Sequence, residues 1–478
     1  MAKEKSIGIT VKKDKDIAEW YQQVCIKAEV ADYAPVKGCM ILRPLAYHFW
    51  QTIMDDFNKR LKKNKVKNAY FPIFIPESFF KKEAEHAKGF KPEVAWIANR
   101  DEGSDRLALR PTSETIMYDS YSKWIRSWRD LPLKINQWAN VIRWETKATK
   151  LFLRSREFLW QEGHCVYETE KERNKETIIY LKEYQDLVES LLAVPLMVGR
   201  KSEKEKFAGA DATYAIEAFM PDGKALQMGT SHNLSQGFAK VFGINFLGKD
   251  KKEHLPFQNS WGISTRLIGG MIMVHSDDKG LVIPPRMAPN KLVIIPIIFD
   301  KTADKVNKKA KEIEKELKAL DPILDDRDDY TPGWKYNEWE LKGVPLRLEL
   351  GPKDYEKKHV VIVRRDNGKK EFIKWTDLKK KIPELLEKMQ KDLYEKAKKQ
   401  LDDAIVDVKD FKHFIKAIKD RKIVKTVFCG EVECEDEIKF KADGATSRCA
   451  PLENEKAQGK CIHCGKEAKY NMFFSKSY

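Results

Sequence analysis

The sequence predicts a mixed α/β (α+β) protein built from three parts, and three observations support this prediction. Between Trp138 and Glu168, two strand-like arms flank a polar loop, which indicates an antiparallel hairpin within a sheet. Beyond residue 289, strands alternate with helices, as in a small α/β domain. Five of the eight cysteines lie in the last fifty residues, which predicts a small metal-stapled unit. We expect the three parts to be residues 1–288, 289–400 and 401–478.

The composition is that of a large globular chain with a basic surface. Its 478 residues are 42% hydrophobic and 34% charged, with a formal net charge of +16. This balance suits a polyanionic partner such as nucleic acid, and it equally suits solvated lysine-rich helices. Apolar runs stay well short of the roughly 20 residues that cross a membrane. The start, MAKEKSIGIT, lacks the apolar core of a secretory signal. We therefore expect a cytoplasmic protein without membrane association.

The first part begins with two predicted helices and a proline-bearing strand. Residues 15–31 have a helical pattern, and apolar residues recur at helical spacing from Pro44 onward. Residues 68–76 are expected to form one strand, whose two prolines indicate a sheet edge or an interface. An ordinary α/β core would give the same pattern.

A short strand at 107–109 leads through a proline turn to the start of another predicted helix. Thr112 or Ser113 is suited to cap this helix. Capping alone would explain the motif, and a ligand role for Glu114 explains it equally well.

The hairpin carries an unusual set of charged residues inside its arms. Arg143, Glu145, Arg154, Arg156 and Glu157 occupy positions where a structural hairpin would place Val, Ile or Thr. Paired arginines and carboxylates on a sheet suit a bound polyphosphate and the edges of a base. The alternative is an exposed strand with a solvated charged face.

Two later segments of the first part also carry candidate ligand contacts. Small residues surround Gln227, Thr230 and His232, which would let a ligand approach the backbone. Arg266 lies in a strand–turn–helix segment among small and apolar residues, so it needs a partner. A phosphate would serve, and so would an internal carboxylate.

The cysteines of the tail form two close pairs separated by a linker. Cys429, Cys434, Cys461 and Cys464 match a tetrahedral structural zinc site, for which free thiols are the alternative. Cys449 and His463 are spare candidates, because the two pairs already complete four ligands.

Taken together, these segments resemble a class II aminoacyl-tRNA synthetase, and more narrowly the prolyl-tRNA synthetases of the archaeal and eukaryotic-like type. Residues 44–76 resemble motif 1 of that class, RWE at 143–145 with RSREF at 154–158 resembles motif 2, and GISTR at 262–266 resembles motif 3. The narrower match is PTSE at 111–114, WQEGH at 160–164 and GTSH at 229–232, together with the four-cysteine tail and the terminal tyrosine.

The resemblance implies ATP as a substrate, with Mg²⁺ bridging its phosphates. Arg143 would hold the α-phosphate and the proline carboxylate together, and Arg154 and Arg266 would clamp the γ-phosphate. Arg143 and Arg266 are the expected catalytic residues. Glu145 would accept from the adenine amino group, and Phe158 would stack on the ring. The expected ATP-binding residues are Arg143, Glu145, Arg154, Ser155, Phe158, Gln227, Thr230, Ser264 and Arg266.

The resemblance also implies a site for proline, in which Glu114 suits the cationic secondary amine. The expected proline-binding residues are Thr112, Glu114, Arg143, Trp160, Glu162, His164, Phe207, His232 and Ser264.

The implied macromolecular partners are tRNA(Pro) and a second copy of the chain. Motif 1 builds the dimer interface in that family. Arg347, Glu349 and Lys353 resemble its anticodon-binding region, and Arg and Glu edges can read unstacked bases. A salt bridge at a strand edge would place the same residues there.

The sequence departs from the family pattern after His232, where NLSQG replaces the usual Gly-Gln-Asn type of run, and this leaves that loop's detail open. Between Glu168 and Gly262 we find no room for the large editing insertion of the bacterial-type enzyme. We therefore expect mischarging with alanine or cysteine that is not corrected in cis.

Two other functions compete with a proline–tRNA ligase. A threonyl enzyme would bind a catalytic zinc inside the active-site domain, whereas the clustered thiols here lie outside it. A synthetase-like RNA-binding paralogue would be expected to have lost one of the arginines Arg143, Arg154 and Arg266, which are all present.

Overall fold

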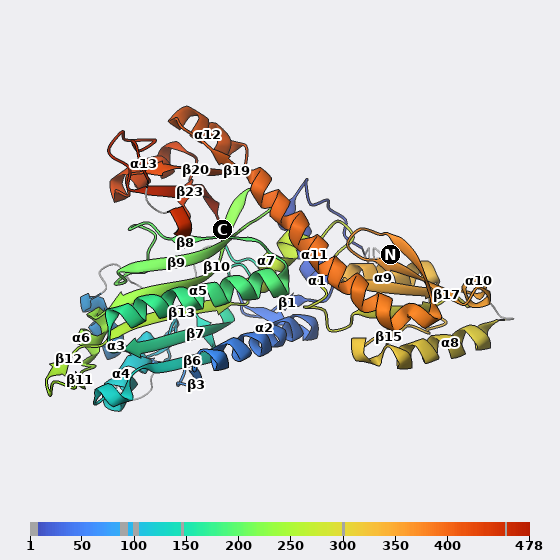
Figure 1. Cartoon of the computed structure of the whole chain (residues 1–478), viewed down its shortest axis with the longest axis horizontal. Coiled ribbons are helices and arrows are strands. Elements are labelled where there is room, and N and C mark those ends of the chain that lie inside the picture. Colours follow the sequence, from blue (N-terminus) through green and yellow to red (C-terminus); the bar gives the residue numbers. More distant parts are fainter. Residues whose placement is uncertain (1–7, 87–93, 99–104, 145–147, 299–301, 455–456) are drawn as a thin grey trace.

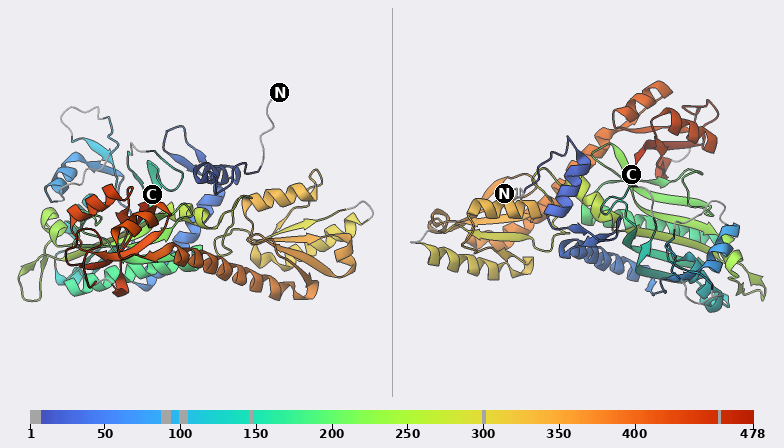
Figure 2. Two further views of the ribbon diagram at one scale, coloured as in Figure 1. Left: turned by 90° about the horizontal axis from the view of Figure 1, so that it is seen from above. Right: turned by 180° about the vertical axis from the view of Figure 1, so that it is seen from behind.

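The computed structural model shows a main body built on one large sheet, with two smaller parts attached to it. It describes residues 8–86, 94–98, 105–144, 148–298, 302–454 and 457–478. A separate α/β arm lies to one side of the main body, and a third, C-terminal part lies above the sheet (Figure 1). The long helix α11 (Leu378–Ala404) runs from the arm to the C-terminal part, and the two views of Figure 2 show the same arrangement.

The main body is organised by a twelve-stranded sheet in which the central neighbours run β10-β13-β7-β6. These strands pair antiparallel. On the other side of β10, β9 pairs antiparallel with β10, and β8 pairs antiparallel with β9. The short strand β3 (Lys67–Asn68) pairs parallel with β6. The bounds are β6 (Leu133–Ile142), β7 (Glu157–Tyr167), β8 (Leu196–Arg200), β9 (Ala212–Phe219), β10 (Lys224–Ser235) and β13 (Phe257–Ser264). The predicted antiparallel sheet is confirmed.

Helices α2 (Pro44–Lys63) and α5 (Glu170–Leu192) pack on the sheet through aromatic side chains. Trp261 of β13 stacks on Tyr180 of α5, with ring centroids 4.1 Å apart and planes 19° apart. Phe57 of α2 meets Trp261 edge-on at 6.1 Å. Burial of each large aromatic ring contributes roughly 1.5–3 kcal/mol, so this cluster fixes the two helices over the strands that carry the site.

The remaining elements of the main body include short helices and small two-stranded sheets. The predicted single strand over residues 68–76 is wrong, because the chain leaves β3 at Asn68 and forms a new strand at Phe74, which pairs with β5 in a separate small sheet. The other bounds are α1 (Ile17–Lys27), β1 (Ala31–Tyr33), β2 (Met40–Leu42), β4 (Phe74–Pro76), α3 (Glu77–His86), β5 (Leu107–Leu109), α4 (Glu114–Trp124), α6 (Gly237–Phe242), β11 (Phe246–Leu247), β12 (Glu253–His254) and α7 (Arg266–His275).

The predicted hairpin is present, but its strands are shorter than expected at the loop end. The ladder between β6 and β7 ends at the pair Ile142 and Glu157. Arg143, Arg154 and Arg156 lie beyond it, because a tight turn with Phe152 at φ 60° closes Lys150 onto Arg154. Most of the charged side chains thus belong to the connecting segment. Glu145 lies outside the described residues.

The second part confirms the predicted alternation of strands and helices. Its five-stranded sheet has the order β15-β14-β16-β17-β18, in which β14 pairs parallel with both neighbours and β17 pairs antiparallel. The elements are β14 (Leu292–Pro296), α8 (Ala303–Glu316), β15 (Ile323–Leu324), α9 (Pro332–Lys342), β16 (Leu346–Leu350), α10 (Pro352–Glu356), β17 (His359–Arg364) and β18 (Lys370–Lys374).

The arm is fastened to the main body by a bidentate ion pair. Arg365 donates to Asp277 through two nitrogens, at 2.8 and 2.6 Å. Burial raises the pKa of Asp277, but the hydrogen bonds and charge of Arg365 outweigh burial and lower it. Asp277 follows the end of α7, so this contact ties the arm to a helix that begins at the candidate phosphate-binding arginine, Arg266.

The C-terminal part is joined to the main sheet by strand pairing. β23 runs parallel to β10 at Lys224 and Ala225, and β22 pairs antiparallel with β8 at Gly199 and Arg200. The expected boundary between the second and third parts, at residue 400, lies inside α11. The elements are β19 (Ile405–Asp407), α12 (Phe411–Lys419), β20 (Ile423–Phe428), α13 (Val432–Lys441), β21 (Thr446–Ser447), β22 (Ala450–Pro451) and β23 (Tyr470–Ser477).

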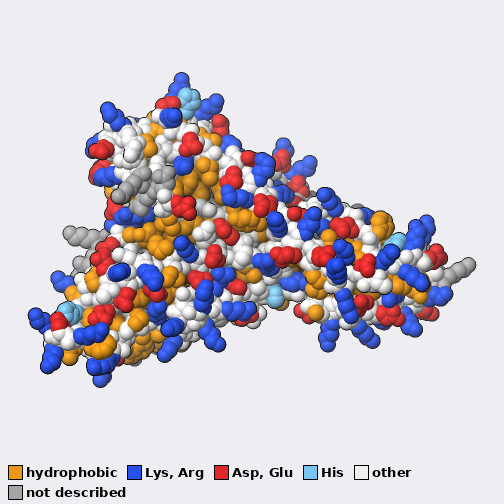
Figure 3. Space-filling model, in the orientation of Figure 1, with side chains coloured by type: hydrophobic (Ala, Val, Ile, Leu, Met, Phe, Trp, Pro, Cys, Tyr) orange, Lys and Arg blue, Asp and Glu red, His pale blue; other side chains and the backbone are white. Residues whose placement is uncertain are grey.

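Lysine and arginine side chains are spread over all three parts on the face drawn in Figure 3. Among the helices of the described ranges, none combines the length and apolar character needed to cross a bilayer.

The contact between β7 and β13 leads to a stability prediction. Gly163 faces Trp261, and a Cβ added to it would lie 2.1 Å from the indole. We expect Gly163→Ala to lower the free energy of unfolding by roughly 1–3 kcal/mol, because the buried ring cannot move without breaking its stack on Tyr180. The measurement is the urea midpoint followed by circular dichroism.

Gly333→Ala in α9 is the matched control, since a Cβ there meets nothing within 4 Å. It should leave the midpoint equal or slightly higher. A Gly163→Ala protein as stable as the control would contradict the packing described here.

Candidate functional site

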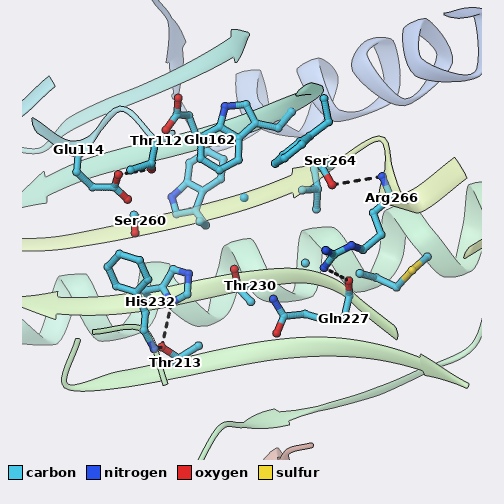
Figure 4. Close-up of a pocket in the computed structure, with 18 of the residues that line it drawn as sticks. Thr112, Glu114, Glu162, Thr213, Gln227, Thr230, His232, Ser260, Ser264 and Arg266 are labelled. Atoms are coloured by element: carbon cyan, nitrogen blue, oxygen red, sulfur yellow. Dashed lines mark hydrogen bonds between the residues drawn. The ribbon is translucent and has the colours of Figure 1, made fainter. Parts of the chain in front are cut away.

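A cavity of about 560 Å³ opens on the sheet where β7, β10 and β13 lie side by side with the segment before α4 and the start of α7. Most of the residues expected to bind ATP or proline line it (Figure 4). They are Thr112, Glu114, Arg143, Phe158, Trp160, Glu162, His164, Phe207, Gln227, Thr230, His232, Ser264 and Arg266.

Strand geometry explains this convergence. Residues two apart in a strand share a face, so Phe158, Trp160, Glu162 and His164 of β7 all reach the same side of the sheet. The antiparallel register sets Trp160 opposite Ser264 and Glu162 opposite Gly262 of β13, and Gly262 opposite Thr230 of β10. Three separate sequence motifs therefore meet across adjacent strands.

Arg154 and Ser155 lie elsewhere. They line a neighbouring cavity of about 280 Å³ bordered by α1 and the turn at Gly38 and Cys39. The Ser155 hydroxyl donates to the Glu157 carbonyl at 2.8 Å. The tight turn over residues 150–154 carries these two residues away from the main cavity.

One end of the main cavity is acidic and buried. Glu162 is 2% exposed; it accepts from Ser113 N at 3.2 Å and from Gln137 Nε2 at 3.0 Å. The Ser113 hydroxyl also donates to Glu162, and the Thr112 hydroxyl donates to Glu114. The expectation that Thr112 or Ser113 caps α4 through its side chain is therefore wrong, because both hydroxyls are used by the carboxylates.

Two histidines of this end, the buried His164 and the partly buried His232, have pKa values shifted in opposite directions. Burial alone would lower the pKa of His164, but its 3.0 Å contact with Glu162 and the charges of Glu114 and Glu162 outweigh burial and raise it. Burial, with a smaller contribution from the charge of His164, lowers the pKa of His232 to about 3. His232 is thus a neutral ring at physiological pH, and its Nδ1 lies 2.9 Å from the Thr213 hydroxyl.

The cavity also carries two guanidinium groups. Arg143 Nε donates to the Pro111 carbonyl at 3.1 Å, and its guanidinium lies 5.4 Å from the Trp160 ring and 5.6 Å from the Phe158 ring. Arg266 donates to the backbone carbonyls of Leu153 and Gln227, each at 3.3 Å. Figure 4 shows Arg266 at the far end of the cavity from Glu114. The cavity therefore separates an anion-binding end from a cation-binding end.

Three polar residues that line the main cavity were not predicted from the sequence. Thr213, Glu205 and Ser260 line the cavity together with the predicted set. Thr213 accepts from Phe207 N at 2.9 Å and also contacts His232, so it links two predicted residues. A polar residue at a position expected to be buried in a mostly apolar strand was the signal that could have identified it.

The four cysteines expected to bind zinc form one cluster. The sulfurs of Cys429, Cys434, Cys461 and Cys464 all lie within 4.8 Å of one another. The Cys434–Cys461 and Cys429–Cys464 separations are 3.8 and 3.6 Å. A zinc ion with four sulfurs at about 2.3 Å would separate them by about 3.8 Å, so the donor set fits this metal.

The two spare candidates have different positions. His463 Nδ1 lies 3.5 Å from Cys434 Sγ, next to the cluster. Cys449 is buried in a separate apolar group with Met197 and Phe473, and burial raises its pKa to about 12.

The residues expected to bind the anticodon lie on β16 and α10 of the arm. Arg347 pairs with Glu349 and with Glu340, each at 3.0 Å. Lys353 is exposed. Arg347 and Glu349 therefore form an internal pair, as the salt-bridge alternative expects.

Three family models match successive parts of the chain. Residues 90–275 match the tRNA synthetase class II core domain (G, H, P, S and T), residues 291–385 an anticodon binding domain, and residues 411–478 the prolyl-tRNA synthetase C-terminal domain. These segments correspond to the main body, the arm and the C-terminal part.

Similar proteins match over nearly the whole length. A proline–tRNA ligase of Alkaliphilus oremlandii is 48% identical over 467 residues, which is 97% of this chain and 96% of that protein. Proline–tRNA ligase 2 of Bacillus thuringiensis is 47% identical over 481 residues, covering 100% of both chains.

A solved structure has the same fold throughout. Prolyl-tRNA synthetase from Cryptosporidium parvum, complexed with halofuginone and AMPPNP, superposes with a TM-score of 0.93 at 44% identity over 99% of this chain and 98% of that one. The same enzyme complexed with L-proline and AMP matches equally well. With this identity over the full length and all three family models in order, the chain belongs to the prolyl-tRNA synthetases of the class II aminoacyl-tRNA synthetase family.

Proposed function

We propose that this chain is a proline–tRNA ligase that activates proline with ATP to prolyl-adenylate and transfers proline to the 3′ end of tRNA(Pro). The observation that carries the proposal is the cavity that brings Arg143 together with buried carboxylates and has Arg266 at the far end from Glu114. Its relatives are proline–tRNA ligases, and the Cryptosporidium enzyme has been solved with proline, AMP and AMPPNP.

The acidic end suits proline. Glu114 would pair with the cationic secondary amine, while Glu162 is held by Ser113, Gln137 and His164 and keeps the end negative. Trp160, Phe207 and the neutral His232 supply flat apolar faces for the ring, and Phe207 and His232 already lie 4.9 Å apart. Thr112, His164 and Ser264 complete the proposed proline set.

The basic end suits ATP and the reaction itself. The proline carboxylate attacks the α-phosphorus, and pyrophosphate leaves. Arg143 lies between the two ends and would hold both anions in contact, which offsets their repulsion and the charge that develops at phosphorus. Arg266 would bind the γ-phosphate, and Mg²⁺ would bridge the phosphates. Phe158 would stack on adenine, with Gln227, Thr230 and Ser264 lining the nucleotide site.

Two of the proposed ATP contacts in the motif 2 segment, Arg154 and Ser155, lie outside the main cavity. Arg154 and Ser155 lie in the neighbouring cavity, so they would reach the nucleotide only by a movement of the turn over residues 150–154. Glu145 is proposed from the motif alone.

The arm would bind the anticodon through Arg347, Glu349 and Lys353. The internal pairing of Arg347 means that a base would compete with Glu340 or Glu349 for its donors. We also propose that the chain acts in the cytoplasm as a homodimer. Exposed aromatic residues of the motif 1 region, Tyr47, Tyr70 and Phe74, support a partner surface, being 47%, 70% and 50% exposed.

We retain 1–288, 289–400 and 401–478 as the proposed domains. The segment from 168 to 262 is filled by α5 and by strands of the main sheet, which supports the proposed lack of a cis-editing insertion.

The role of Arg143 can be tested by ATP–pyrophosphate exchange with proline in the absence of tRNA. Arg143→Ala should lower the exchange rate by roughly 10²–10³-fold, because it removes a donor aimed at the developing charge. Arg129→Ala, at an exposed position over Trp128, is the control and should retain the wild-type rate. If Arg143→Ala retained the wild-type exchange rate, Arg143 would not have the role proposed for it in the reaction.

The proposed absence of editing predicts activation of wrong substrates. A pocket rejects a smaller amino acid only by the lost contacts, which are worth roughly 1–3 kcal/mol per methylene. The wild-type protein should therefore show weak exchange with alanine and cysteine at high concentration, and should not hydrolyse alanyl-tRNA(Pro). Strict selectivity for proline, or rapid hydrolysis of the mischarged tRNA, would refute this.

The cysteine cluster predicts one zinc ion per chain, measured by inductively coupled plasma mass spectrometry of purified protein. Cys461→Ala should lose the metal and lower the thermal midpoint of the C-terminal part, since thiolate ligation stabilises small folds directly. Cys449→Ala, which alters a buried cysteine outside the cluster, should keep the zinc. Equal metal content in both variants would contradict the assignment.

A further inference from the structure

The proline end of the cavity is closed by a segment that is held from outside the main body. Residues 201–211 connect β8 to β9, and their side chains Glu205 and Phe207 line the cavity. Ser202 at the start of this segment is 2% exposed, and it is buried against the C-terminal part.

We propose that Glu435 of α13, acting through Ser447 and Ser202, is a positioning residue for the proline end of the cavity. The inference rests on the proposed function, because it assigns the role of this wall in binding proline.

Four polar groups form a chain that crosses the boundary between the main body and the C-terminal part. Ser447 Oγ lies 2.7 Å from Glu435 Oε1 and 3.0 Å from Ser202 Oγ. Ser202 Oγ in turn accepts from Glu205 N at 3.2 Å. A carboxylate only accepts and a hydroxyl has one proton, so Ser447 donates to Glu435 and Ser202 donates to Ser447. The Glu435 carboxylate thereby fixes the orientation of the Ser447 and Ser202 hydroxyls, the second of which contacts the segment that lines the cavity.

The chain is shielded from water along its length. Glu435, Ser447 and Ser202 are 1%, 0% and 2% exposed. Ser447 N adds a second bond to Glu435 at 3.3 Å. A buried hydroxyl that loses its acceptor cannot turn to water instead, so the loss is transmitted to its neighbour.

Other contacts hold the same segment to the C-terminal part. Glu217 of β9 accepts from Arg448 at 3.0 Å and pairs with Lys201, and all three side chains are buried. Lys204 pairs with Asp436, the neighbour of Glu435. At Gly199 the backbones approach so closely that a Cβ would lie 2.0 Å from the Ala450 carbonyl.

The far end of the segment is tied to the proline end itself. Phe207 N donates to Thr213 Oγ1 at 2.9 Å, Thr213 contacts His232, and the Phe207 and His232 rings lie 4.9 Å apart. Figure 4 shows Thr213 and His232 together on the floor of the cavity. A displacement of Ser202 therefore moves the aromatic wall for proline, whereas Arg143 and Arg266 are held by other contacts.

The experiment measures the KM for proline and the KM for ATP in pyrophosphate exchange. Glu435→Ala should raise the KM for proline roughly tenfold while changing the KM for ATP by less than twofold, as expected for one lost buried hydrogen bond. Glu435→Gln restores a carbonyl acceptor and should recover the proline KM. Glu433→Ala, at an exposed position of the same helix, is the control.

A double-mutant cycle tests whether the contact itself carries the effect. Ser202→Ala and Ser447→Ala should each raise the KM for proline. The KM of the double variant should be no higher than that of the more strongly impaired single variant. Ser202→Ala leaves the C-terminal part intact, so it keeps the test valid where Glu435→Ala fails to fold. Zinc content must equal wild type in every variant, since Glu435 adjoins Cys434.

Native-state hydrogen exchange gives a readout that does not depend on catalysis. Peptides covering residues 201–207 should exchange faster in Glu435→Ala than in wild type, and peptides of the arm should be unchanged. Equal rises in both KM values, an unchanged proline KM, or additive effects in the cycle would overturn the proposal. A wild-type protein without proline-dependent exchange would instead refute the proposed function, while the hydrogen-exchange result would still decide the coupling.

Discussion

The antiparallel register of β7, β13 and β10 determines where the side chains of the cavity lie. Each strand presents alternate residues to one face, and the register sets Trp160 beside Ser264 and Gly262 beside Thr230. A slip of one residue in any strand would turn its whole set to the other face. The stack of Trp261 on Tyr180, made possible by the absence of a side chain at Gly163, holds that register against α5. The chemistry of the site thus depends on an apolar contact beneath it.

The carboxylates and guanidinium groups that line the cavity differ in their partners. Isolated buried charges are costly, and the buried Glu162 carboxylate is matched with donors from other elements, whereas Glu114 accepts from the nearby Thr112 hydroxyl. Glu162 joins β7 to the segment before α4 through Ser113 and to β6 through Gln137. The same contacts keep a negative charge beside the place proposed for the proline amine. The guanidinium groups of Arg143 and Arg266 donate to backbone carbonyls, which position them on the cavity wall.

The C-terminal part is integrated into this frame through strand pairing and buried polar contacts. It extends the main sheet through β22 and β23, and Arg448 reaches Glu217 of β9. The cysteine cluster lies in the same part, with Cys434 on the helix that also carries Glu435. A family model matches residues 411–478 of this part.

Much of the site could be predicted from the sequence because its information is local. Periodicity identified α5 and the hairpin, and the spacing of two cysteine pairs was enough to predict the cluster. The resemblance of short motifs to the family implied most of the residues that line the cavity, from Thr112 to Arg266. A short motif keeps its residues at fixed spacing, so the match could be made from the sequence.

Contacts between distant segments were decided only by the tertiary structure. Local rules assigned Ser113 to a helix cap, whereas a carboxylate 49 residues away takes its hydroxyl. The tight turn at Phe152 removed Arg154 and Ser155 from the main cavity, which a strand pattern could not foresee. The contact of Ser202 with Ser447 joins residues 245 apart. Periodicity reports which face of an element is buried, but the partner it meets there depends on how the whole chain packs.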